Sequence, residues 1–250
     1  AYQLYGDGSA LTGIAAGFSP DSQENLYAGT SAGAASDADT CYNIALGYKA
    51  ACSLNSGDNN IVLGCCTGLN LTSGSDNIFL GKYAGKCITS GTGNIALGRE
   101  ALEGITGNGN CNVVIGEGAA GCNINGDKNV ALGFAAGRFS SGDDNIAIGK
   151  STLASITPGG AQNVAIGTNA MTNASGTNTD GNVVIGYNAG DAFGANNVYG
   201  TVLIGRQAGS SINNGDAAGT ITKVIADVVI TTFFQKKIFI SSVASWLHPE

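Results

Sequence analysis

Two glycine-rich strings are the candidates for phosphate-binding chemistry in this chain. Gly116 to Gly121 reads GEGAAG after the strand-like NVVI and satisfies the GxGxxG dinucleotide fingerprint, and Gly142 to Ser151 reads GDDNIAIGKS, similar to a phosphate-binding loop. A phosphate site also needs the N-terminus of a helix, but the turn-rich CNINGDKN follows the first string. The second string has six residues between its glycines where four are needed. We interpret both strings as copies of a repeat and expect no nucleotide binding.

Acid–base and nucleophilic catalysis have few candidate residues. The only histidine, His248, lies at the C-terminal end, so any triad or imidazole base would depend on a chain terminus. A repetitive rod also gives no reason to expect the concave cleft that an active site needs. We therefore expect that the protein is not an enzyme.

Aspartates recur in the predicted turns and raise the question of calcium binding. Carboxylates in stacked turns bind calcium in some solenoids, but the calcium-binding nonapeptide GGxGxDxUx is absent. We expect turn-forming roles and no cofactor, with calcium binding as the alternative. The turn aspartates are Asp58, Asp76, Asp127, Asp143, Asp144, Asp180 and Asp216.

The seven cysteines fit no zinc pattern, because Cys65 and Cys66 are adjacent and no CxxC occurs. An odd number leaves at least one thiol free or paired between chains. Cys52, Cys87 and Cys122 fall at similar phases of the repeat described below, which favours packing in the core as small hydrophobes, with disulfides as the alternative.

The composition excludes two classes of partner. A net charge of −7 and a pI near 4.5, with scattered basic residues, argue against nucleic-acid binding. The most apolar stretch, residues 221–240, carries Lys223, Asp227, Lys236 and Lys237, which argues against a membrane span. The 40 Gly against 3 Pro indicate instead a tight turn that is repeated many times.

An internal repeat, N-[I/V]-x-[L/I]-G, dominates the sequence. Weaker copies flank it, NLYAG from Asn25 and TVLIG from Thr201, and the glycines lie roughly 16 to 19 residues apart, a spacing typical of stacked coils. The β-branched residues and the short run predict one strand per coil, hence an all-β, parallel β-solenoid of about eleven coils. The full copies start at Asn43, Asn60, Asn77, Asn94, Asn112, Asn129, Asn145, Asn163 and Asn182 and end at Gly47, Gly64, Gly81, Gly98, Gly116, Gly133, Gly149, Gly167 and Gly186.

The apolar third position of the unit bears on assembly. Because strand side chains alternate, we expect the second and fourth positions to face the coil interior and the third to face outward. A strand that is apolar on both sides is buried on both sides, so a partner should cover the outward column, most simply further copies of the chain. This reasoning predicts an oligomer interface formed by Val62, Phe79, Val114 and Val184.

Copies such as NVAIGTNAM (Asn163 to Met171) and NVVIGYNAG (Asn182 to Gly190) resemble the head repeat of trimeric autotransporter adhesins of the YadA type. They resemble still more the looser repeats of bacteriophage tail-fibre and other virion proteins, as does GDGSALTGI at Gly6 to Ile14. The resemblance covers about residues 25–209. It implies a left-handed parallel β-roll, three associated chains, and a role as a receptor-binding head or as a spacer in a fibre.

The chain departs from the adhesin pattern, since its coils are longer and it has no heptad stalk. We divide it into an N-terminal cap or connector (1–24), a β-solenoid (25–210) and a C-terminal capping or oligomerising β segment (211–250). We expect a homotrimeric phage tail-fibre or virion surface protein whose partners are itself, other virion or fibre proteins and a host surface receptor, located on the virion or an extracellular surface. The alternatives are a bacterial cell-surface adhesin and a subunit of a self-assembling extracellular filament.

Overall fold

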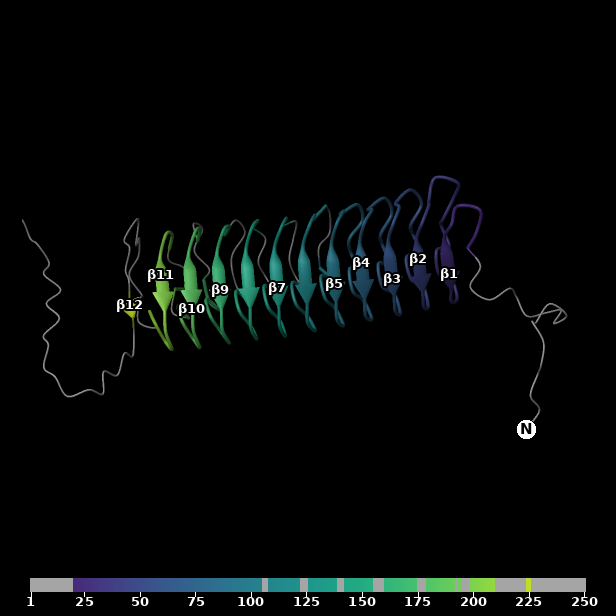
Figure 1. The fold of residues 1–250 in the computed structure, drawn as a ribbon. Coiled ribbons are helices and arrows are strands. Elements are labelled where there is room, and N and C mark those ends of the chain that lie inside the picture. Colours follow the sequence, from purple (N-terminus) through teal and green to yellow (C-terminus); the bar gives the residue numbers. More distant parts are fainter. Residues whose placement is uncertain are drawn as a thin grey trace, which may run out of the picture.

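Stacked coils form a rod in which every coil contributes one short strand to a single sheet of parallel strands (Figure 1). The computed structural model describes residues 20–104, 108–121, 126–138, 142–154, 160–174, 179–191, 193–194 and 198–209, and the strand at 224–225. The predicted all-β, parallel β-solenoid is confirmed. The connector expected over 1–24 and the segment expected over 211–250 lie mostly outside the described residues.

Each strand except the last coincides with one copy of the repeat. Neighbouring strands pair in parallel without a shift, so that Ile44, Ile61 and Ile78 stack above one another. The strands are β1 (Leu26–Ala28), β2 (Ile44–Leu46), β3 (Ile61–Leu63), β4 (Ile78–Leu80), β5 (Ile95–Leu97), β6 (Val113–Ile115), β7 (Val130–Leu132), β8 (Ile146–Ile148), β9 (Val164–Ile166), β10 (Val183–Ile185), β11 (Val202–Ile204) and β12 (Val224–Ile225).

A ladder of buried asparagine side chains sets this register. Along most of the stack an asparagine of the repeat accepts two hydrogen bonds at Oδ1 from the next one: Asn94 Oδ1 accepts from the backbone N–H and from Nδ2 of Asn112, both at 3.0 Å. Asn94 Nδ2 in turn donates to Asn77 Oδ1 at 3.1 Å and to the Gly109 carbonyl of the following coil at 2.8 Å. An asparagine side chain inside the stack therefore joins three coils, which explains why the same residue recurs at this position.

The ladder has a defined beginning and end. At its start, the Asp21 carboxylate takes the place of a preceding asparagine and accepts from Asn25 N–H at 2.8 Å and from Asn25 Nδ2 at 3.2 Å. At the other end, Asn182 Oδ1 accepts from the N–H of Thr201 at 3.0 Å, and threonine has no amide group to continue the series.

The turn before each asparagine forms a second ladder that runs in the opposite direction. Here the side chain accepts from the preceding coil, as Asp58 Oδ1 does from Cys41 N–H at 2.8 Å and Asp127 Oδ1 from Asn110 N–H at 2.7 Å. Ser75 plays the same part for Asp58 N–H at 3.0 Å. The turn aspartates thus satisfy backbone donors of neighbouring coils.

The glycine that ends each strand is required by its conformation and its neighbours. Gly81 has φ +129°, and a Cβ on it would lie 2.6 Å from the carbonyl oxygen of Gly98 in the next coil. Other residues can therefore hardly replace this glycine without separating the coils.

The core is narrow and is filled by residues of complementary size. The middle residue of each strand faces the fourth residue after the glycine: Phe79 lies opposite Gly85, whose added Cβ would meet the ring at 2.7 Å, whereas Ala96 shares its coil with the buried Leu102. In the coil of β7 both positions are small, Ala131 and Gly137, and a small cavity lies there. The cavity is lined by Ala120, Asn129, Val130, Ala131, Gly137, Asn145, Ala147 and Leu153.

Removing one amide from the asparagine ladder should be costly. Asn94→Ala leaves two donors of Asn112 and the Gly109 carbonyl without this partner, so we expect a loss of at least about 3 kcal/mol, at about 1–3 kcal/mol for each of these three buried groups. The exposed Asn55→Ala is the matched control and should change stability by less than about 0.5 kcal/mol. Urea unfolding followed by circular dichroism measures both, and equal losses would contradict the ladder's role.

Filling the cavity should stabilise the rod. Ala131→Val adds two carbon atoms beside Gly137 and should gain about 1.6 kcal/mol, at about 0.8 kcal/mol per buried carbon. The same change at Ala96 meets Leu102 in a filled coil and should lose about 1–3 kcal/mol. Thermal unfolding measures both variants, and melting temperatures that shift in the same direction would contradict the size matching.

Candidate interaction surface

The middle residue of each strand points into the coil. Phe79 is fully buried, whereas its neighbours Ile78 and Leu80 are 37% and 42% exposed. The sequence analysis expected this middle residue to face outward. The predicted oligomer interface is therefore wrong for all four of its residues. Each of them is buried inside its own coil: Val62, Phe79, Val114 and Val184.

The repeat itself contains the signal that fixes this orientation. The first and third positions of the unit lie on the same side of a strand, because side chains alternate. The asparagine at the first position is buried, as Asn77 is before Phe79, because its amide must bond to neighbouring coils. The third position therefore also faces inward, and the second and fourth positions face out.

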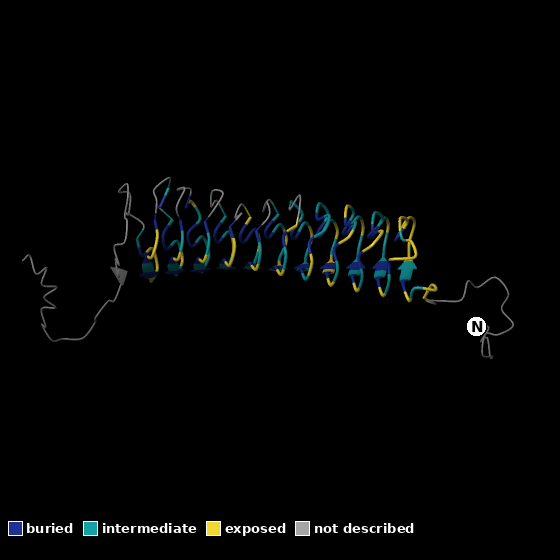
Figure 2. Cartoon of the chain, turned by 90° about the horizontal axis from the view of Figure 1, so that it is seen from above, coloured by how far each residue is buried: buried dark blue, intermediate teal, exposed yellow. Residues whose placement is uncertain are grey.

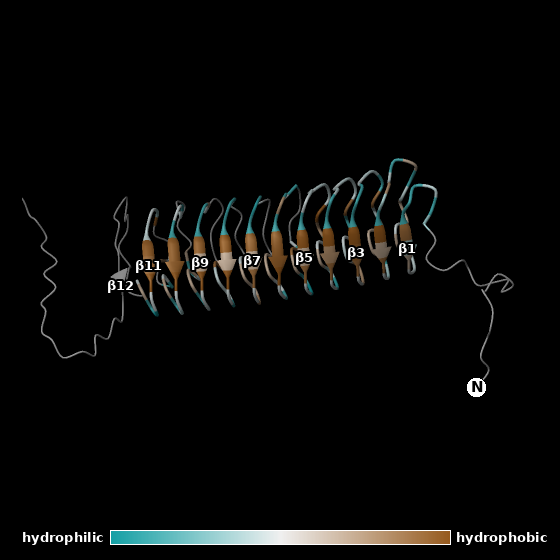
Figure 3. Ribbon diagram, in the orientation of Figure 1, coloured by the Kyte–Doolittle hydropathy of each residue, from teal (hydrophilic) through white to brown (hydrophobic). Residues whose placement is uncertain are grey.

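The outward positions form an apolar face that runs along the rod. Figure 3 shows most of the strands β1–β11 in the hydrophobic colour, and Figure 2 shows that they lie along one side of the rod. Ile or Val occupies the second position and Leu or Ile the fourth in β2–β11, half-exposed or exposed in every strand. We call this surface the sheet face; within the described residues no other segment covers it.

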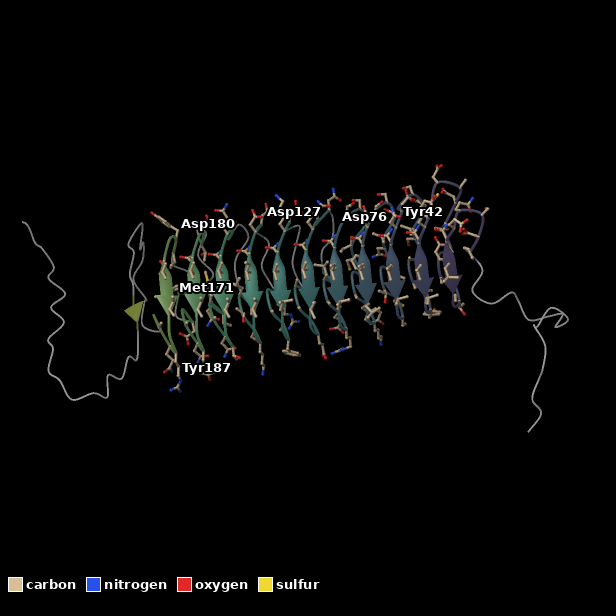
Figure 4. The ribbon with its side chains drawn as sticks, in the orientation of Figure 1. Tyr42, Asp76, Asp127, Met171, Asp180 and Tyr187 are labelled. Atoms are coloured by element: carbon tan, nitrogen blue, oxygen red, sulfur yellow. The ribbon has the colours of Figure 1, made fainter. Side chains whose placement is uncertain are left out.

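One edge of the sheet face, where the strands begin, carries acidic side chains. Figure 4 shows Asp76, Asp127 and Asp180 along this edge, together with Tyr42. Among the described residues, Lys128 is the one basic residue in a turn that precedes a strand. We call this the acidic edge; its carboxylates are Glu24, Asp58, Asp76, Asp127, Asp143, Asp144 and Asp180.

The opposite edge, where the strands end, carries basic and aromatic side chains. Lys150 lies 5.9 Å from the centre of the Phe134 ring, and Arg206 5.8 Å from that of Tyr187, each from the neighbouring coil. Among the described residues, all basic side chains except Lys128 lie within five positions after the glycine that ends a strand. We call this the basic edge; it comprises Lys49, Lys82, Lys86, Arg99, Arg138, Lys150 and Arg206.

Several acids also lie on the basic edge, and three are paired locally. Glu103 forms an ion pair with Lys86 at 3.1 Å, and Arg99 pairs with Glu100 at 2.7 Å and with Glu117. Asp191 is a further acid after β10. The edge keeps an excess of positive charge.

The sequence predicted structural roles for the asparagines and glycines of the repeat. In the structure the asparagines stack in one column along the rod, and the glycines that end the strands stack in another. The cysteines differ from expectation: Cys52 and Cys87 are half-exposed, so they do not pack in the core. The described cysteines carry free thiols: Cys41, Cys52, Cys65, Cys66, Cys87 and Cys111. Cys122 lies outside the described residues.

The adjacent thiols of Cys65 and Cys66 are 3.6 Å apart. Burial raises the pKa of the Cys66 thiol, and its contact with Cys65 adds to the rise. Cys66 is therefore a thiol at neutral pH, not the thiolate that nucleophilic chemistry needs.

The strings considered for phosphate binding lie in ordinary coils. Gly116 to Gly121 forms the turn after β6, and Gly142 to Ser151 spans the turn before β8, the strand and its glycine. In the described ranges no helix is long and apolar enough to cross a membrane. The same residues contain no group of three or more His, Cys, Asp or Glu side chains placed to hold a metal ion. Asp216 and His248 lie outside them.

No protein-family model matches the chain, and no curated protein or solved structure matches it. The function is therefore inferred from the geometry, above all from the sheet face and its two edges.

The two sides of one strand should respond differently to truncation. Phe79→Ala empties the core and should cost about 3–5 kcal/mol. Leu80→Ala changes an exposed residue and should cost less than about 1 kcal/mol in the dissociated chain. Urea unfolding at low protein concentration compares them, and a larger loss for Leu80→Ala would overturn the assigned orientation.

Proposed function

We propose that the protein is a structural and adhesive fibre protein: a rigid rod segment of a phage tail fibre or virion surface, assembled as a homotrimer, that presents its turns for host attachment. The observation that carries this proposal is the uncovered sheet face. The all-β solenoid forms a rod, and burial of its apolar face would favour the association of rods side by side.

The size of the sheet face supports association. Ten steps between β1 and β11 at about 4.8 Å give a length of roughly 50 Å, and three residues per strand give a width of about 10 Å. The resulting area of about 500 Å² in projection is near the upper end of apolar patches on monomers. Parallel sheets are covered on both faces in almost all proteins, so an uncovered one needs a partner.

The construction of the coils suits a mechanical role. Among the described residues, each coil is bonded only to its neighbours, through parallel strand pairing, the asparagine ladder and the turn ladder, so resistance to bending is distributed along the rod. The variable segments that precede each asparagine differ in length and residues, while strands β1–β11 keep one length and one apolar pattern. A host-binding surface could vary there without altering the rod.

Association through the sheet face predicts a mass of three chains for the wild-type protein. Ile78→Lys with Leu80→Lys should place charge on the face and release monomers that keep the β circular-dichroism spectrum, because both side chains lie outside the core. Asn55→Lys with Ser73→Lys adds the same charge at exposed positions away from the strands and should leave the assembly intact. Light scattering measures the mass, and negative-stain images measure the length of the rods.

A wild-type protein that stays monomeric at every concentration would refute the proposal. An assembly that the sheet-face variant does not weaken would show that a different surface holds the chains together.

A further inference from the structure

Two adjacent cysteines directly after β3 hold their sulfur atoms close together at the surface of the rod. The Sγ atoms of Cys65 and Cys66 are 3.6 Å apart, and Cys65 is exposed whereas Cys66 is half-exposed. Among the described residues, this is the one contact between two cysteine sulfurs. Neither the asparagine ladder nor the sheet face uses these side chains, so the fold does not account for the pair.

The coils on either side hold the backbone of the pair in place. The Cys66 N–H donates to the Tyr48 carbonyl at 2.8 Å, and the Cys65 carbonyl accepts from the Tyr83 N–H at 3.2 Å. The next residue, Thr67, is fully buried. The two sulfur atoms are therefore attached to a backbone that is already fixed.

A disulfide between these two residues would be strained. Disulfides join Cα atoms that are about 4.4–6.8 Å apart, whereas adjacent residues hold their Cα atoms about 3.8 Å apart. Strain of this kind makes a disulfide easier to reduce. The pair is therefore suited to remain a dithiol and to bond to an atom placed between the two sulfurs.

The separation of the two sulfurs indicates the geometry of such an atom. With bonds of about 2.3 Å to sulfur, an atom whose bond angle lies between a right angle and the tetrahedral angle spans sulfurs roughly 3.3–3.8 Å apart. The observed 3.6 Å lies in this range. A linear two-coordinate ion would need roughly 4.6 Å at the same bond length. The pair thus fits a pyramidal or tetrahedral centre.

The surroundings of the pair favour a pyramidal centre that brings its own third substituent. A tetrahedral metal ion needs further protein ligands, and the described residues contain no group of three or more His, Cys, Asp or Glu placed to hold one. Burial raises the pKa of the Cys66 thiol, which opposes a metal ion that binds only after the proton is lost. A trivalent organic arsenic oxide avoids both difficulties, because its third substituent is carbon and its oxygen takes up the thiol protons.

We propose that Cys65 and Cys66 form a preorganised two-sulfur site that binds trivalent organoarsenic oxides of the type R–As=O. In the reaction two S–H bonds and the arsenic–oxygen bonds break, two arsenic–sulfur bonds form, and the oxygen leaves as water with both thiol protons. Arsenic stays trivalent, so no oxidant or reductant is needed. The site does not depend on the proposed lateral assembly.

Phenylarsine oxide is the probe that tests this site. Isothermal titration calorimetry of the reduced full chain should show one tight site per chain, and mass spectrometry should place one phenylarsenic group on the peptide that contains both cysteines. An excess of 2,3-dimercaptopropanol, a small competing dithiol, should release the group. Because the chelate holds arsenic through two bonds, Cys65→Ser and Cys66→Ser should each weaken binding at least about a hundredfold.

Two other cysteines and a free peptide provide the controls. Cys111 is exposed, as Cys65 is, and Cys87 is half-exposed, as Cys66 is, so Cys111→Ser and Cys87→Ser should leave the tight site unchanged. A free peptide of residues 64–68 contains the dithiol without the coils and should bind at least about tenfold more weakly, because its sulfurs are not preorganised. Circular dichroism checks that each variant keeps the β spectrum.

The outcomes test the site separately from the proposed function. A chain that does not bind phenylarsine oxide, or a tight site that survives Cys65→Ser, would overturn the proposal. Loss of the site in Cys87→Ser or Cys111→Ser would assign it to other thiols. A free peptide that binds as tightly as the whole chain would refute preorganisation by the coils. None of these results depends on the mass of the assembly.

Discussion

The amide side chain of one asparagine per coil is the interaction on which the rest of the structure depends. It bonds to the coil before and the coil after, so it fixes both the spacing and the register of the stack. Once the asparagines are aligned, the strands pair without a shift, the glycines lie above one another, and the third residue of each unit must face inward. The apolar sheet face and its charged borders follow from that alignment.

The sequence was sufficient to predict the strands, their parallel pairing and the structural roles of the repeated asparagines and glycines, because these features recur in every coil. It was not sufficient, as first interpreted, to decide which side of the strand faces the core. Apolarity alone could not orient Val62 and Phe79, because both sides of the strand are apolar. The buried amide two residues earlier would have settled the question, because a side chain that bonds three coils cannot face outward.

Other features could not be predicted because they depend on the closed coil. The match between Phe79 and Gly85, or Ala96 and Leu102, requires knowing that a strand residue meets the chain as it returns across a narrow interior. Cys52 and Cys87 are close in sequence to the buried Leu54 and Ile88, yet both lie half-exposed. The segregation of charge was present in the sequence, but it became a property of two edges only when the stacking was known.

The two ends of the asparagine ladder differ in a way that gives the rod chemical polarity. At the coil of β1 the donors of Asn25 are already occupied by the Asp21 carboxylate, whereas at the coil of β11 the series stops because Thr201 has no side-chain amide. A further coil could join the first one through this ladder only by displacing Asp21. The number of asparagines between these two residues therefore acts as a ruler: adding or deleting a repeat between them would change the length of the fibre in steps of one strand spacing, with both ends of the ladder unchanged.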